Sequence, residues 1–184
     1  MTDKDLEIVL RCRSGDEEAF TDFVLHYTPY VYRTAVAFLH DRTEAEDLTQ
    51  EIFLKVHRSL SQLHDLRTFP AWFKRLITNA CLDHLKKKTP VPTAEFELDR
   101  AAPSGPEQWE TRLVLREALA GLSLEQRQVL LLREWQGYEY REIAELMGIP
   151  LGTVKSRLFS ARAHLKNVLE EEPRVRGTST GRDR

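Results

Sequence analysis

A basic, hydroxyl-rich helix face is the part of this sequence whose residue types point to chemistry. It lies in the segment IPLGTVKSRLFSARAHL. At 100° per residue, Phe159 falls beside Ser156 and Ser160, with Lys155 on the flank of the same face. Hydroxyl and ammonium groups bind phosphates and base edges, and an apolar group contacts the thymine methyl. The opposite side carries an apolar stripe of Val154, Leu158, Ala161 and Leu165. The pattern therefore favours a docked helix that reads DNA.

A helix-turn-helix pattern surrounds this segment. In YREIAELMGIPLGTVKSRLF, Ala144 stands where two helices meet closely, Gly148 stands at the turn, and Val154 is the buried anchor. A plain helical hairpin is the alternative. The module's predicted DNA contacts are Arg141, Thr153, Lys155, Ser156, Arg157, Phe159, Ser160 and Arg162.

The position of three of these residues on the helix bears on what each one contacts. Phe159 packs on a neighbouring helix or a partner protein if it does not meet DNA. Arg157 lies closer to the buried stripe, so an internal ion pair is an alternative. Arg162 lies at the edge of the face, where we expect it to grip a phosphate.

The net charge of −2 conceals a segregation of charge along the chain. Residues 67–88 are rich in Lys and Arg and contain one acidic residue, Asp83. Residues 151–168 carry Lys and Arg with no acidic residue. Two basic patches on an otherwise acidic chain predict two contacts with a polyanion, and two solvated helix faces are the alternative.

A third face belongs to the helix predicted over residues 43–60. Its buried side consists of Ala45, Leu48, Ile52 and Val56. Another side consists of Asp47, Gln50, Glu51, Leu54 and Arg58. An acidic face with an exposed leucine suits docking against a basic partner helix, and a solvated surface with Leu54 half covered is the alternative. No histidine or motif turns the nearby carboxylates into a metal site, so neither a metal nor a cofactor is predicted.

The elements that position these faces are predicted to be helices throughout, which gives an all-α fold. Three capping boxes are expected to begin helices: Ser14 with Glu17, Thr43 with Glu46, and Ser123 with Gln126.

The domain organisation follows from the proline-rich stretch 89–108, which predicts a flexible linker. It separates helical domains over residues 15–88 and 109–170, and residues 171–184 are predicted to be a disordered tail. Cys12 and Cys81 lack metal spacing and are predicted to be buried, reduced thiols. No apolar run approaches the ~20 residues of a membrane span, and the acidic, polar amino terminus is unlike a signal peptide, so a cytoplasmic protein is expected.

Most of the sequence resembles the extracytoplasmic-function (ECF) sigma factors, the small two-domain members of the bacterial sigma-70 family. Their region 4 is similar to LSLEQRQVLLLREWQGYEYREIAELMGIPLGTVKSRLFSAR. Their regions 2.1 and 2.2 are similar to YTPYVYRTAVAFLHDRTEAEDLTQEIFLKVHRSL, and regions 2.3 and 2.4 to FPAWFKRLITNACLDHLKKK. The resemblance covers roughly residues 15–170, in the family's order.

The resemblance implies a non-enzymatic role in transcription initiation. A member of this family gives core RNA polymerase its promoter specificity. Its first domain binds the β′ clamp helices and reads the −10 element, and its second reads the −35 element and contacts the β flap. An anti-sigma factor is expected to hold the protein inactive by masking these faces. Neither a small-molecule substrate nor membrane insertion is implied. The implied core-polymerase contacts are Asp47, Gln50, Glu51, Leu54 and Arg58.

The resemblance also implies a loop that captures a base flipped from the non-template strand of the −10 element. Residues 63–69 match this loop, and Asn79 matches a polar position of the following helix, expected over about residues 70–87. Trp72 is expected to belong to the core rather than to stack on a base. The −10 contacts are expected to be Leu63, His64, Arg67, Phe69, Lys74, Arg75, Asn79, Asp83, Lys86 and Lys87.

Two positions depart from the family's pattern. Many relatives have Ser or Thr where this chain has Glu139, and many have Arg where it has Ser160. A free-standing dimeric helix-turn-helix regulator is the alternative function. The acidic face with its leucine and the second basic patch argue against it. The sequence shows no set of nucleophile, base and oxyanion donors of the kind that a hydrolase needs.

Overall fold

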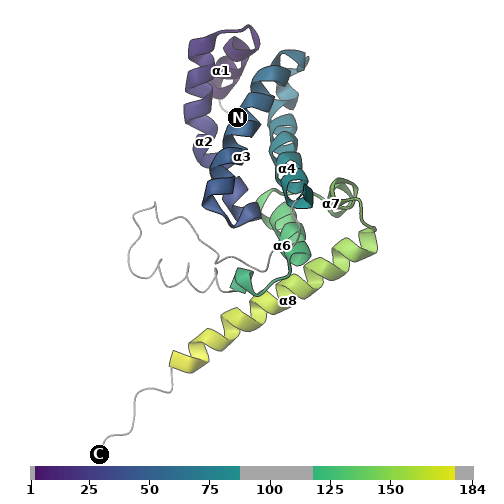
Figure 1. The fold of residues 1–184 in the computed structure, drawn as a ribbon. Helices are drawn as coiled ribbons and strands as arrows, with labels where there is room; N and C mark the ends of the chain where they lie inside the picture. The colour runs from purple at the N-terminus through teal and green to yellow at the C-terminus, as the bar shows by residue number, and fades with distance from the viewer. Residues whose placement is uncertain (1–2, 88–117, 177–184) are drawn as a thin grey trace, which may run out of the picture. The chain divides into compact units, whose positions relative to one another are not determined.

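The computed structural model describes residues 3–87 and 118–176, and every regular element in these ranges is helical. The chain divides into two compact units, Met1–Ala94 (unit 1) and Glu95–Arg184 (unit 2) (Figure 1). The predicted all-α class with two helical domains is therefore confirmed. The predicted linker over residues 89–108 lies outside the described ranges.

Unit 1 is a helical bundle in which α2, α3 and α4 pack on one another and α1 packs on α2 (Figure 1). Short 3-10 turns join α3 to α4. The elements are α1 (Asp3–Arg13), α2 (Glu17–Leu39), α3 (Arg42–Ser59), η1 (Leu60–Gln62), η2 (Leu66–Thr68) and α4 (Phe69–Lys87). Helix α1 precedes the predicted domain start at residue 15, yet its Val9 is fully buried.

Helices α2 and α3 begin at aspartates, so the capping boxes predicted at Ser14 and Thr43 are wrong. Asp16 Oδ1 accepts the Ala19 N–H at 2.9 Å, and Asp41 Oδ1 accepts the Glu44 N–H at 3.0 Å. The Ser14 hydroxyl instead donates to the Arg11 carbonyl at 2.8 Å and serves the end of α1. Thr43 lies inside the first turn of α3. A carboxylate is favoured at this end of a helix because it meets the positive pole of the helix dipole.

Aromatic rings fill the core of unit 1. Phe23 is fully buried, and its ring centroid lies 5.6 Å from that of Phe73 and 5.9 Å from that of Phe69. Edge-to-face packing at such distances stabilises aromatic pairs beyond their buried area. The two cysteines of the chain also lie in this unit, with Cys12 partly buried and Cys81 fully buried. The prediction of two buried thiols is confirmed for Cys81 only.

The part of unit 2 that the structure describes has a mostly aliphatic core. Its elements are α6 (Leu124–Leu130), η3, a π-helical turn (Leu131–Trp135), α7 (Tyr140–Met147) and α8 (Leu151–Arg176). The capping box predicted at Ser123 is confirmed, because the Gln126 N–H donates to Ser123 Oγ and the Ser123 N–H donates to Gln126 Oε1.

The helix-turn-helix predicted in unit 2 is formed by α7 and α8. Gly148 ends α7 with φ +65°, a left-handed conformation that glycine adopts without steric cost, and the Ile149 N–H donates to the Ala144 carbonyl at 3.0 Å. At the start of α7, the Glu142 carboxylate accepts the Glu139 N–H at 2.7 Å. Helix α8 continues to Arg176, past the expected domain end at residue 170, and the remaining tail lies outside the described ranges.

Candidate functional site

The outward face of α8 carries the residues that sequence reasoning placed there. Val154, Leu158 and Ala161 are buried as predicted, and Leu165 is partly exposed. On the other side, Phe159 is 76% exposed, so it does not pack within its own unit. The exposed polar residues around it are Lys155, Ser156 and Ser160. A large ring held in water beside cationic and hydroxyl groups is suited to contact a macromolecule.

The other predicted −35 contacts differ in how accessible they are. Arg141 on α7 is exposed, whereas Thr153 and Arg157 on α8 are partly buried. The charge of Arg157 contributes to lowering the pKa of Glu125, after the hydrogen bonds from the Glu125 N–H and the Ser123 hydroxyl. Arg162 is bonded to Glu134 and Tyr140 within unit 2. Its guanidinium is therefore engaged before any DNA arrives.

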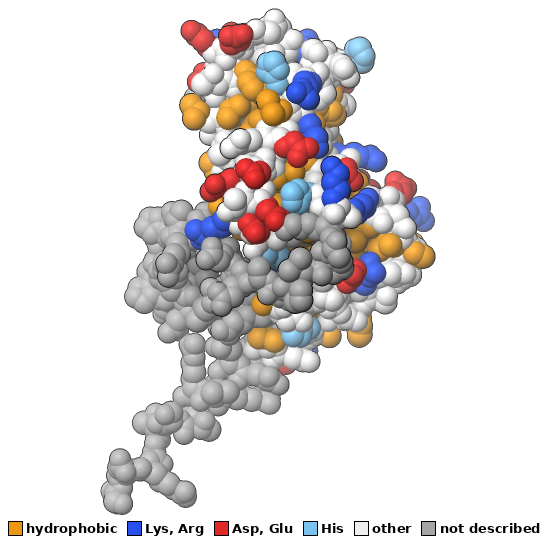
Figure 2. Space-filling model, in the orientation of Figure 1, with side chains coloured by type: hydrophobic (Ala, Val, Ile, Leu, Met, Phe, Trp, Pro, Cys, Tyr) orange, Lys and Arg blue, Asp and Glu red, His pale blue; other side chains and the backbone are white. Residues whose placement is uncertain are grey.

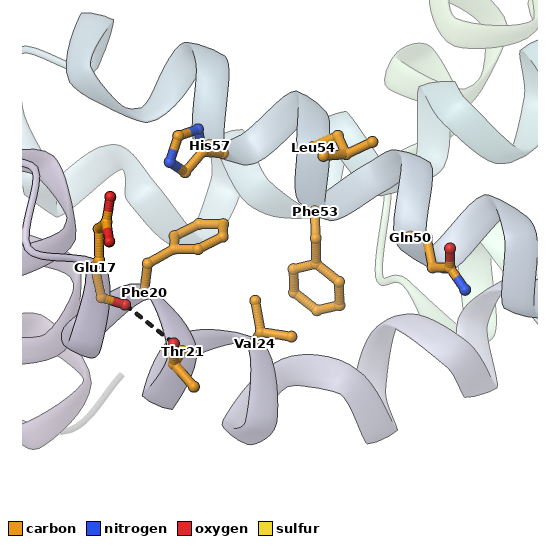
Figure 3. A pocket seen from close by; sticks show the side chains of 8 residues that line it. All are labelled: Glu17, Phe20, Thr21, Val24, Gln50, Phe53, Leu54 and His57. Atoms are coloured by element: carbon orange, nitrogen blue, oxygen red, sulfur yellow. Dashed lines mark hydrogen bonds between the residues drawn. The ribbon is translucent and has the colours of Figure 1, made fainter.

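An apolar groove opens between α2 and α3 in unit 1, with a volume of about 560 Å³ (Figure 3). Phe20 and Val24 face it from α2, and Phe53 faces it from α3. Its other lining residues are Glu17, Thr21, Gln50, Leu54 and His57. The Phe20 ring meets the His57 ring edge to face, with centroids 4.7 Å apart. Sequence periodicity missed this groove, because it depends on two helices that are not read together.

The α3 face beside the groove is exposed along its length. Its buried side is confirmed, since Ala45, Leu48, Ile52 and Val56 are at most 2% exposed. The predicted outer residues Asp47, Gln50, Glu51, Leu54 and Arg58 are all exposed. Leu54 is 56% exposed, so this apolar side chain stands at the groove's edge among charged neighbours. Figure 2 shows orange, red and blue side chains close together on this unit.

One carboxylate of this face is held ionised. Lys55 lies 2.9 Å from Glu51 and, through this hydrogen bond, lowers the pKa of the Glu51 carboxyl. The charges of Lys87 and His84 from α4 act in the same direction. The α3 face is thus acidic, with basic groups of α4 beside it.

Helix α4 brings most of its predicted −10 contacts to one exposed side. These residues are Arg75, Asn79, Asp83, Lys86 and Lys87. Asp83 and Lys86 lie 3.7 Å apart as an exposed ion pair, which is weak in water. Lys74 is partly buried on another side of the helix. The exposed side has a net positive charge suited to a nucleic-acid backbone.

The loop before α4 presents Leu63, His64 and Arg67. His64 and Arg67 are exposed, and Leu63 is partly buried. Arg67 pairs with Asp65, whose carboxylate also accepts the Arg67 N–H at 2.9 Å. Arg13 of α1 donates to the Leu63 and His64 carbonyls at 3.4 and 3.3 Å. Sequence reasoning missed Arg13, because nothing in a local pattern links residues fifty positions apart.

The structure corrects the assignment of Phe69 as a DNA contact. Phe69 is 2% exposed and stacks on Phe73 with ring centroids 5.3 Å apart. Its ring closes the aromatic core at the start of α4, so it holds the loop's end rather than facing solvent. Trp72 is partly buried, with its ring 5.9 Å from that of Phe69, as expected of a residue at the core's edge.

Within the described residues, none of the helices combines the length and apolarity needed to cross a membrane. The sequence matches two family models, described as Sigma-70 region 2 over residues 23–90 and Sigma-70, region 4 over residues 112–165.

Two curated relatives extend over nearly the whole chain. The RNA polymerase sigma-H factor of Pseudomonas aeruginosa is 33% identical, covering 91% of this chain and 95% of the relative. The ECF RNA polymerase sigma factor SigM of Mycobacterium tuberculosis is 32% identical, covering 90% of this chain and 84% of the relative.

Two solved structures share the fold. CnrH in complex with the cytosolic domain of CnrY has a TM-score of 0.57 at 22% identity, covering 92% of this chain and 99% of that chain. The sigma factor RpoE in complex with the anti-sigma factor NepR from Bartonella quintana has a TM-score of 0.57 at 21% identity, covering 82% of this chain and 96% of that chain.

Proposed function

Because the chain belongs to the extracytoplasmic-function group of the sigma-70 family, we propose that its exposed faces divide the work of promoter-specific initiation. The family consists of transcription initiation factors rather than enzymes. The observation that carries the proposal for DNA is Phe159, a ring that is 76% exposed on the reading side of a helix-turn-helix.

Helix α8 is the proposed reader of the −35 element. Phe159 supplies an apolar contact to a thymine methyl, and Lys155, Ser156 and Ser160 supply bonds to phosphates or base edges. Arg141, Thr153 and Arg157 stand at the margin of this surface. Phosphate contacts set the register, while the outward side chains of α8 read the sequence.

The exposed side of α4 and the preceding loop are the proposed −10 surface. Arg75, Asn79 and Lys86 lie along one side of α4, and the loop's His64 and Arg67 extend it. Opening the duplex and holding a flipped base requires a pocket and a positive backbone track, both of which a loop and a basic helix can provide. Phe69 is left out of this surface because it is buried.

The α2–α3 groove and the acidic α3 face are the proposed docking site for core RNA polymerase. Leu54 provides an apolar anchor at the edge of the groove, with Asp47 and Glu51 exposed on the same helix. An apolar centre with a charged rim is the usual composition of such interfaces. The fitting partner is a basic helix, which the β′ clamp would present, and the β flap would meet unit 2.

Control by an anti-sigma factor is the proposed mode of inhibition. Two proteins with this fold were solved in complexes, one of them with a protein called an anti-sigma factor. A partner that covers the α2–α3 groove competes with polymerase for the same apolar surface. A pull-down from unstressed native host cells should recover such a partner, and recovery of none would count against this part of the proposal.

Binding to sigma-free core RNA polymerase, followed by run-off transcription from a pool of host promoter fragments, tests the whole proposal. We expect tight association and new transcripts. The two weak DNA contacts act together once both units are tethered to polymerase, because tethering raises their effective concentration. Absence of core binding, together with dimeric binding to a palindrome, would overturn the proposal in favour of a free-standing regulator.

Two matched pairs of variants assign the surfaces. Leu54→Arg should weaken core binding by more than about tenfold, as loss of an interface anchor does. Leu25→Arg is its control, because Leu25 is 70% exposed on α2 and does not line the groove. Phe159→Ala should weaken promoter binding by about tenfold, whereas Leu169→Ala, an exposed leucine further along α8, should not.

A further inference from the structure

Tyr140 lies between two arginines at the start of α7. The guanidinium carbon of Arg133 is 5.1 Å from the centre of the Tyr140 ring. Arg162 of α8 donates from Nη1 to the Tyr140 hydroxyl at 3.2 Å. The ring therefore takes a cation on its face and a hydrogen bond at its oxygen, and it links α7 to α8.

Glu134 binds the rest of the Arg162 guanidinium. Nε and Nη2 both donate to Glu134 Oε1, at 3.2 and 2.6 Å. All three guanidinium nitrogens of Arg162 are thus engaged by η3 and α7 of the same unit. These hydrogen bonds also raise the pKa of Arg162, so the side chain stays charged.

Arg133 completes the arrangement on the other side. It lies 2.9 Å from Glu139 as an ion pair and donates to the Tyr138 carbonyl at 3.0 Å. Two arginines, two glutamates and a tyrosine therefore join η3, the start of α7 and the middle of α8. We name this set the Tyr140 cluster: Arg133, Glu134, Glu139, Tyr140 and Arg162.

Stability alone explains the Tyr140 cluster poorly. The side chains of Arg162 and Glu134 are 48% and 54% exposed, and ion pairs this open to water contribute little to folding. The ion pair has a larger effect on the geometry of α8 than on stability, because Arg162 lies one turn after Phe159 on that helix. Because Arg162 is held against η3 and α7, the turn of α8 that carries Phe159 is held in one orientation.

We propose that Arg162 is a positioning residue of the DNA-reading helix, held by Glu134 and Tyr140, and not a phosphate contact. The inference rests on the proposed function of α8 as a reader of DNA. It changes the role that sequence reasoning gave Arg162, because three of the five N–H donors of its guanidinium already bond Glu134 and Tyr140. Arg162 thereby acts on specificity through the placement of Phe159 and its neighbours.

The salt dependence of DNA binding separates the two roles. Each phosphate contact adds about 0.9 to the slope of log affinity against log salt. The probe is a short duplex chosen from host promoter fragments by binding to the full-length chain, with a scrambled duplex for comparison. For Arg162→Ala we expect an unchanged slope and a several-fold smaller ratio of specific to scrambled affinity. Lys155→Ala, which removes an exposed cation of the same face, should lower the slope.

Glu134→Gln is the second variant, because it keeps the side-chain shape and removes its charge. We expect a smaller loss of specificity than for Arg162→Ala, because the amide oxygen still accepts a hydrogen bond, and no loss in the double variant beyond that of Arg162→Ala, since the two residues act as one unit. Arg162→Lys should restore specificity only in part, because an ammonium cannot bond Glu134 and Tyr140 as the planar guanidinium does. Thermal unfolding of each variant establishes that the fold is intact.

A lower slope for Arg162→Ala, together with tighter binding by Glu134→Gln, would overturn the inference. That result would mean that Glu134 merely competes with phosphate for Arg162. The same measurements are made with the free chain and with the polymerase-bound chain. Failure to bind core polymerase would therefore contradict the proposed function, while the slopes of the free chain would still decide the role of Arg162.

Discussion

The cores of the two units consist of different kinds of side chain. In unit 1, large rings fill the interior, and the buried hydroxyls of Thr34 and Thr49 donate to carbonyls one turn earlier in their own helices. In unit 2, the buried side chains are mostly aliphatic, yet Arg127 is only 5% exposed. Its Nε and Nη2 donate to the carbonyls of Leu119 and Leu122, each at 3.2 Å.

This difference predicts which kind of substitution destabilises each unit most. Long helices satisfy their own backbone groups, so unit 1 depends above all on filling volume between helices. In unit 2, a buried cation donates to two carbonyls that precede α6, so part of the backbone hydrogen bonding there depends on one side chain. We therefore expect unit 1 to respond most to lost volume and unit 2 to lost donors.

The largest effect expected is that of Phe23→Ala in unit 1. Removing a fully buried ring that contacts Phe69 and Phe73 should lower the free energy of unfolding by about 3–5 kcal/mol. Urea unfolding followed by Trp72 fluorescence measures this, with Trp109 and Trp135 replaced by Phe in every variant. Phe23→Leu should lower the free energy of unfolding by less. A loss below about 1 kcal/mol for Phe23→Ala would refute the expectation that unit 1 depends mainly on filled core volume.

Arg127→Leu is the corresponding change in unit 2. Leucine keeps the site apolar but leaves the Leu119 and Leu122 carbonyls without this donor, which should cost about 1–3 kcal/mol. The measurement is urea unfolding followed by Trp135 fluorescence, with Trp72 and Trp109 replaced by Phe. Arg127→Lys should recover part of the loss. A leucine variant as stable as the parent would remove the contrast between the units.

The smallest effect concerns the helix caps, and it compares an observed cap with a predicted one. Asp41→Ala should cost about 1 kcal/mol, because the Glu44 N–H loses its acceptor. Thr43→Ala should change the stability by no more than about 0.5 kcal/mol, since Thr43 is not the cap of α3. Thermal unfolding of the two variants side by side gives the comparison, and the opposite order would reinstate the capping box predicted from sequence.

Sequence reasoning succeeded where a residue's surroundings follow from its own helix. The buried sides of α3 and α8 and the glycine turn at Gly148 depend on local periodicity and backbone geometry, so they could be predicted. The exposure of Phe159 and Leu54 follows from the same periodicity, because each lies away from the buried stripe of its helix.

Sequence reasoning failed where a second element decides the surroundings. Phe69 looks like part of an exposed loop, but aromatic partners from α2 and α4 bury it. Arg162 looks like a free cation until Glu134, twenty-eight positions earlier, is brought to it. Two of the three capping boxes failed for a simpler reason, because a nearby aspartate competed with the hydroxyl as the cap.

The full burial of Cys81 and the partial burial of Cys12 have a consequence for oxidant chemistry. Burial raises the pKa of the Cys12 thiol to about 11 and that of the Cys81 thiol to about 12. Oxidants and disulfides react with the thiolate, and at neutral pH each of these sulfurs is almost entirely protonated. These are the only cysteines in the chain. We therefore expect both thiols to react slowly with oxidants at neutral pH.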